Sequence, residues 1–183
     1  MTQCTAPRFP KGPLTKRQEQ KELENHNCVE TTQYNPQERM QFYPFDTAAE
    51  IKIVSFDSGD SAFFHSLPTR GKEIDFAKIT EVKTLEKEQL EELTNIFYNV
   101  SYKGDVLLEY ETGCYNPRNA ILFYDSSDHL LEFIELCFEC DGNRLSSDKI
   151  IPGDWCDQKY SLLKQFFLKS GIEIGTIKAL RER

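Results

Sequence analysis

Cysteine is the residue type in this chain whose spacing best suits chemistry. Four of the six cysteines, Cys114, Cys137, Cys140 and Cys156, lie in the second half of the sequence. Two interpretations of them involve no catalysis. Either they are buried, reduced thiols that act as small hydrophobic side chains, or Cys114 forms a structural disulfide with Cys137 or Cys140.

Two further interpretations involve a metal or redox chemistry. The four cysteines together would give zinc a full ligand set, because Cys137 and Cys140 have the C-x2-C spacing of a zinc half-site, although the other spacings match no finger or ribbon. A catalytic dithiol is the weakest alternative, since a thioredoxin-type motif lies at a helix N-terminus and this pair does not. Outside the group, Cys4 and Cys28 are interpreted as incidental thiols.

A β-hairpin has to bring these cysteines together. Residues 120–124 and 130–140 are rich in apolar side chains and flank the turn-forming sequence SSDH, which predicts two antiparallel strands. A two-residue turn places Cys114 opposite Glu139, and a four-residue turn places it opposite Asp141. In either register Cys114 lies beside the C-F-E-C segment.

Side-chain alternation limits which cysteines can meet. In a regular strand Cys137 and Cys140 point to opposite faces, so their sulfurs approach only if the strand ends or bulges near Phe138. Cys156 is predicted in the first turn of the last helix, where the helix dipole lowers a thiol pKa. His129 lies at the far end of the hairpin, too distant to act as a base for a cysteine.

The hairpin sequence resembles a pattern in uncharacterised bacterial proteins, several of them exported or lipoprotein-like. In that pattern a Cys-x-x-Pro-Arg segment precedes one strand and a Cys-Phe-Glu-Cys segment ends the next; here these are residues 114–118 and 137–140. The resemblance implies no known activity. It favours an exported protein and a disulfide over zinc, and it implies that six residues act together: Cys114, Pro117, Arg118, Cys137, Glu139 and Cys140.

Arg118 and Glu139 are candidate contacts for a ligand or a partner. Arg118 lies at the same end of the hairpin as Glu139, so it is interpreted either as half of a surface ion pair or as an anchor for an anionic ligand or a partner carboxylate. The rest of the sequence offers no catalytic set, because the three histidines are scattered and no H-E-x-x-H or G-x-S-x-G motif is present.

The elements around the hairpin indicate an α+β fold. Strands occur in runs, which predicts a mainly antiparallel sheet, a meander plus the central hairpin, with two amphipathic helices packed on one face. Asp154 and Gly171 are the expected N-cap and C′ residues of the second helix. Further strands are predicted at 50–56, 62–65, 79–83 and 106–110, a loop at 144–154, and helices at 84–99 and 155–169.

The N-terminal part of the chain differs in composition from the rest. Residues 1–42 are polar, which predicts a flexible arm with a short helix over KRQEQKELEN, and residues 43–183 are predicted to form a single domain. No signal-like or membrane-spanning apolar segment is present. The expected location is the cell envelope or periplasm if a signal segment precedes Met1 in the natural protein, and the cytoplasm otherwise.

The charge of the chain bears on its partners. A net charge of −8 gives no electrostatic footprint for nucleic acid. We therefore expect a non-enzymatic binding or interaction domain without a cofactor, which takes a basic protein partner as an inhibitor or immunity-type protein does. The alternative is a thiol- or zinc-dependent enzyme or a redox protein that uses Cys114, Cys137 and Cys140.

Overall fold

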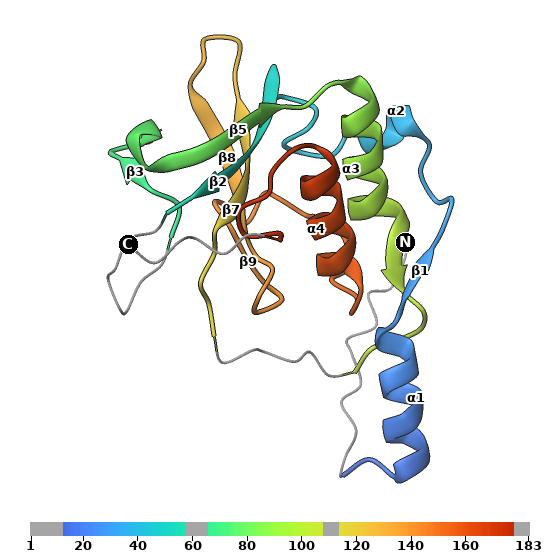
Figure 1. Cartoon of the computed structure of the whole chain (residues 1–183). Helices are drawn as coiled ribbons and strands as arrows, with labels where there is room; N and C mark the ends of the chain where they lie inside the picture. Colours follow the sequence, from blue (N-terminus) through green and yellow to red (C-terminus); the bar gives the residue numbers. More distant parts are fainter. Residues whose placement is uncertain (1–12, 58–65, 108–113, 178–183) are drawn as a thin grey trace.

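The computed structural model describes residues 13–57, 66–107 and 114–177. Its main sheet has five strands in the order β5-β2-β7-β8-β9, and every neighbouring pair is antiparallel (Figure 1). The predicted α+β class with a mainly antiparallel sheet is therefore confirmed. The strands are β2 (Glu50–Phe56), β5 (Ile79–Thr84), β7 (Asn119–Tyr124), β8 (Leu130–Cys137) and β9 (Gly142–Leu145).

Two helices cover one face of this sheet, as predicted. Figure 1 shows α3 (Lys87–Asn99) and α4 (Lys159–Lys169) side by side against it. Burial of apolar side chains between the helices and this face is the main stabilising contribution to such a layered fold. The core there includes Ile53, Ile121 and Ile134 from the sheet and Leu93, Phe97, Leu163 and Phe167 from the helices.

The opposite face of the sheet has a smaller apolar cluster. Leu67, which precedes β3 (Thr69–Arg70), and Ile74 of β4 (Glu73–Ile74) pack with Val54 and Leu122 of the sheet; β3 and β4 form a short hairpin. A single 3-10 turn, η1 (Phe76–Lys78), then leads into β5. Both sheet faces are thus covered by apolar contacts, which explains why all six residues of β7 are buried.

The segment predicted as a flexible arm has regular structure over residues 13–42. The expected helix is present as α1 (Lys16–His26), and β1 (Cys28–Glu30) pairs with β6 (Val100–Tyr102). A short helix, α2 (Pro36–Arg39), lies against α3 because the buried Arg39 donates hydrogen bonds to Thr94 Oγ1 and to the carbonyl of Glu91. These contacts join the segment to the sheet-and-helix body. No described helix is both long enough and apolar enough to cross a membrane.

Several element boundaries differ from the sequence-based expectation. The helix predicted from residue 84 begins at Lys87, because Thr84 still pairs with Lys52 and Leu85 N donates to Ile51 O. Val106 and Leu107 are not in a strand, and the rest of the strand predicted at 106–110 lies outside the described residues, as does the one at 62–65.

The central hairpin follows the register expected for the four-residue turn over most of its length. Asn119 pairs with Leu136, and the register shifts only between Phe123 and Tyr124. The chain then turns after Cys137 into β9, part of which was predicted as loop. Asp141 occupies this turn with a φ of 46°, a conformation that Asp tolerates better than most residues.

Candidate functional site

Two disulfides fix the end of the hairpin and the chain segments around it. Cys114 bonds to Cys140, one of the two pairings expected from the sequence, with Cα atoms 5.7 Å apart. Cys28 bonds to Cys156, with Cα atoms 5.1 Å apart. The interpretation of Cys28 as an incidental thiol is therefore wrong, since it ties β1 to the loop before α4.

The position predicted for Cys156 is also wrong. Residue 156 precedes α4, which begins at Lys159 with Gln158 rather than Asp154 as its N-cap. The disulfide to Cys28 and a hydrogen bond from Asp157 N to His26 O hold this loop against the end of α1, so the helix starts later. The helix ends as expected, with Gly171 at a φ of 89°.

Cys137 is the remaining described cysteine, and it is reduced and buried. Its side chain lies on the same sheet face as Glu135, and Sγ accepts a hydrogen bond from Asn116 N at 3.3 Å. The four-cysteine zinc set does not assemble, because Cys156 pairs with Cys28, and the described residues contain no group of three or more His, Cys, Asp or Glu suited to a metal ion. With 1% of its surface exposed, the Cys137 thiol is not presented to a substrate.

Arg118 and Glu139 occupy different surroundings at the hairpin end. Glu139 is exposed on the turn after β8. Arg118 is half-buried, its Nη1 is buried without a hydrogen-bond partner among the described residues, and its Cβ lies beside Gly175. The predicted grouping of Arg118 and Glu139 with the disulfide as contacts for a ligand or partner stays a prediction.

Beside Cys156 the surface forms a hollow of about 470 Å³. Its wall comes from the end of α1, from β6, from the β8–β9 turn and from the loop before α4. The Cys28–Cys156 bond ties this loop to β1, which pairs with β6. The lining residues include three aspartates and no Lys or Arg: His26, Tyr102, Asp141, Asn143, Gly153, Asp154, Trp155, Cys156, Asp157 and Tyr160.

Aromatic rings line the floor of this acidic hollow. Trp155 stacks on Tyr160 with ring centroids 4.9 Å apart, and the Tyr102 hydroxyl donates to the Trp155 carbonyl at 3.1 Å. Asn143 Nδ2 donates to the Tyr160 hydroxyl at 2.7 Å, while burial raises the pKa of that phenol to about 12. The floor is therefore rigid and uncharged at neutral pH.

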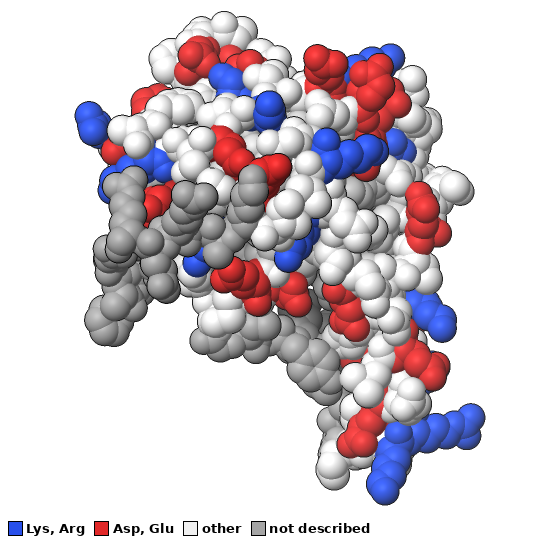
Figure 2. Space-filling view, in the orientation of Figure 1, with Lys and Arg blue, Asp and Glu red and all other residues white. Residues whose placement is uncertain are grey.

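The rim of the acidic hollow concentrates negative charge. Asp141, Asp154 and Asp157 are exposed around it. Burial raises the pKa of Asp141, and repulsion from Asp157 adds to the rise although Lys164 opposes it. A raised carboxyl pKa next to a second carboxylate indicates a place where a cation would be favourable. Figure 2 shows that acidic side chains also spread over the visible face, with a group at the start of α3.

A larger groove of about 860 Å³ lies between α3, α4 and β1. Several of its polar groups already pair with one another: Lys169 with Glu92 at 2.7 Å, and Cys28 N with Gln158 at 2.7 Å. These contacts leave little free charge there to select a ligand. The acidic hollow is for that reason the stronger candidate site.

Comparison with models of known protein families finds no match, and neither do comparisons with curated proteins and with solved structures.

Sequence reasoning located the cysteines but missed the hollow beside them. One signal was available in the sequence D-W-C-D at residues 154–157, where two carboxylates and the only tryptophan of the chain flank a cysteine. The contribution of His26 and Tyr102 had no such signal, because it depends on the pairing of Cys28 with Cys156.

Proposed function

We propose that the chain is a non-enzymatic binding module for a basic protein partner, and that the acidic hollow receives a Lys or Arg side chain of that partner. The observation that carries the proposal is the combination of three aspartates on the rim with the stacked Trp155 and Tyr160 on the floor. Carboxylates attract the charged group, and aromatic faces bind the cation and its aliphatic stem.

Two further features support the proposal. The net charge of −8 favours encounter with basic proteins. The two disulfides suit an oxidising compartment, which exported proteins reach. We propose such a location for this chain. The Cys28–Cys156 bond limits the movement of the loop that forms one wall of the acidic hollow.

The proposal can be tested with an arginine-rich peptide as the probe and the fluorescence of Trp155, the only tryptophan, as the signal. We expect saturable binding that weakens as salt is raised, because exposed charges are screened. The double variant Asp141→Asn with Asp157→Asn should bind the peptide about tenfold more weakly, which corresponds to a loss of about 1.4 kcal/mol of binding free energy. The exchange relieves the repulsion between the two carboxylates but also alters the contact of Asp157 Oδ1 with His26 Nδ1 at 3.9 Å, so the unfolding midpoint of the variant is measured beside its affinity.

The matched control removes the same charge elsewhere. Asp148 and Glu88 are exposed and lie outside the acidic hollow, so Asp148→Asn with Glu88→Gln should leave the affinity nearly unchanged. Equal losses in both double variants would show that only net charge matters and would reject the acidic hollow as the site. No binding by the natural chain at low salt would reject the proposed function.

A further inference from the structure

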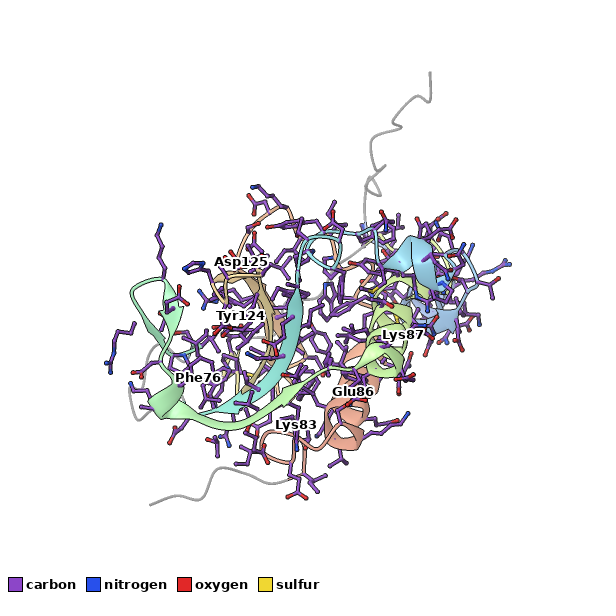
Figure 3. All side chains as sticks on the ribbon, turned by 90° about the horizontal axis from the view of Figure 1, so that it is seen from above. Phe76, Lys83, Glu86, Lys87, Tyr124 and Asp125 are labelled. Carbon is purple, nitrogen blue, oxygen red and sulfur yellow. A yellow bond between two sulfur atoms is a disulfide. The ribbon has the colours of Figure 1, made fainter. Side chains whose placement is uncertain are left out.

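Strand β5 forms one edge of the main sheet. Among the described strands its only neighbour is β2, and Figure 3 shows it along the outside of the sheet, from Phe76 past Lys83 to Glu86. Four of its six residues are exposed, including Val82 with 40% of its surface accessible. An edge strand with open backbone groups is a template for a further strand.

The pairing with β2 determines which backbone groups of β5 point outward. Leu85 N donates to Ile51 O at 2.9 Å. Two residues further along the same ladder, Lys83 lies opposite Ile53. In an antiparallel pair, every second residue turns its N–H and C=O toward the neighbouring strand. Residues 81, 83 and 85 therefore face β2, while Val82 and Thr84 direct their backbone groups outward; the register with β2 shifts at Thr80.

The side chains on the two sides of Val82 carry opposite charges, Glu81 before it and Lys83 after it. If two β5 strands pair antiparallel around Val82, each Glu81 lies opposite Lys83 of the second copy, and each Thr80 lies opposite Thr84. A register centred on Lys83 would instead place two lysines opposite each other, which is unfavourable. Edge lysines normally hinder strand addition, but in the Val82 register each lysine meets a carboxylate.

The side chain of Glu81 is held in place by its own chain. Its carboxylate accepts hydrogen bonds from Ser55 Oγ at 2.6 Å and from the backbone N–H groups of Glu173 and Ile174 at 3.2 and 3.0 Å. The side chain is half-buried and its position is fixed before any partner arrives. A fixed acceptor loses less side-chain entropy on pairing than a mobile one.

We propose that two copies of the chain associate through β5, with an antiparallel strand pair centred on Val82 that joins the two main sheets into one. The outward backbone groups of Val82 form two hydrogen bonds at the centre of the pair and those of Thr84 extend it, while Thr80 lies at the register shift of β5 against β2. Two symmetric Glu81–Lys83 contacts select the register. This surface lies at the opposite edge of the sheet from β9 and the acidic hollow, so it is independent of the function proposed above.

Analytical ultracentrifugation of the full chain over a range of concentrations tests the proposal. We expect a monomer–dimer equilibrium, which Val82→Pro abolishes by removing an outward N–H, a change that an edge strand tolerates. Lys83→Glu should weaken the dimer by about tenfold or more, because it replaces two attractive pairs by repulsive ones. Lys103→Glu, an exposed control on another element, should not.

Mixing variants tests the register itself. Glu81→Lys and Lys83→Glu should each self-associate poorly, yet together form a mixed dimer in which every facing pair has opposite charge. A natural chain that stays monomeric at every soluble concentration overturns the proposal, as does a dimer that survives both Val82→Pro and Lys83→Glu. Failure of the mixed dimer, with folding of both variants verified by circular dichroism, rejects the Val82-centred register.

Discussion

At the scale of single residues, Lys159 has the least usual environment in the described chain. Its side chain is fully buried, with 0% of its surface exposed, and Nζ donates to the carbonyl of Phe97 at 2.9 Å. That carbonyl belongs to the last turn of α3, where helices leave C=O groups without intrahelical partners. Lys159 therefore joins the start of α4 to the end of α3.

The pKa of Lys159 makes the stability of the protein depend on pH. Burial lowers this pKa from 10.5 to about 8, although Asp154 opposes the shift. Between these two values the unfolded chain binds more protons than the folded one, so the free energy of unfolding should rise with pH, with the full cost of the buried charge present below about pH 8. Urea unfolding from about pH 7.5 to about pH 9.5 measures this slope.

The variant Lys159→Met separates this effect from other titrations. Methionine fills a similar volume but has no titrating group. The free energy of unfolding of the variant should therefore rise much less with pH than that of the natural chain. Burial is the main cause that raises the pKa values of Tyr43 and Tyr160 to about 12. Their contribution to stability is lost only above the pH range of this measurement. If the natural chain and the variant show the same slope, Lys159 does not titrate in this range.

At the scale of elements, the loop before α4 is built around a close approach to α3. Gly153 has a φ of 72°, and a Cβ at this residue would lie 2.3 Å from the carbonyl oxygen of Phe97. Neither the backbone angle nor the distance suits another residue. This approach sets one wall of the acidic hollow, which Gly153 lines beside Asp154.

Two glycine substitutions distinguish the clash from the backbone angle. Gly153→Ala combines a positive φ with the contact to Phe97 O, and we expect it to lower the free energy of unfolding by more than about 2 kcal/mol. Gly71→Ala has a φ of 70° but open space around the added Cβ, so it should cost only about 1 kcal/mol. Equal losses, measured by chemical denaturation, would show that the contact with α3 is unimportant.

Periodicity predicted the elements whose apolar residues repeat, and missed those that depend on tertiary contacts. The helical stripe of Leu93 and Phe97 and the alternation of Ile51 and Ile53 were sufficient to predict α3 and β2. The strand β9 contains Gly142 and Asn143, which have low β propensity, and forms because β8 offers an edge.

The candidate site was predictable only in part for the same reason. The register of the hairpin correctly placed Cys114 near Cys140. The pairing of Cys28 with Cys156 joins residues 128 apart in sequence, and no local pattern predicts so distant a partner. The acidic hollow could not be predicted for the same reason, since its walls meet through that bond and through hydrogen bonds between residues far apart in sequence, from Asp157 N to His26 O and from the Tyr102 hydroxyl to Trp155 O.

At the scale of the whole molecule, the two disulfides should contribute unequally to stability. They close chain segments of 128 and 26 residues, and a longer loop loses more entropy in the unfolded state. The chain-entropy estimate gives about 5 kcal/mol for Cys28–Cys156 and about 3.5 kcal/mol for Cys114–Cys140.

Paired serine variants measure this difference. The unfolding midpoint in denaturant should fall further in the variant Cys28→Ser with Cys156→Ser than in Cys114→Ser with Cys140→Ser. The first variant should also bind the peptide more weakly, because the loop that lines the acidic hollow is no longer bonded to β1. The opposite order of stability would mean that native-state packing at the hairpin end outweighs loop entropy.

The Cys28–Cys156 bond also changes what a protease can do to this protein. It closes a covalent ring that contains β2, β5, β7, β8 and β9, the whole main sheet. A single cut anywhere in the ring leaves the two fragments attached, so the nicked protein keeps its mass on a non-reducing gel and separates only when a reductant is added. The chain can thus survive one cleavage as a single molecule, and losing a piece of the sheet requires either a second cut or a reducing environment.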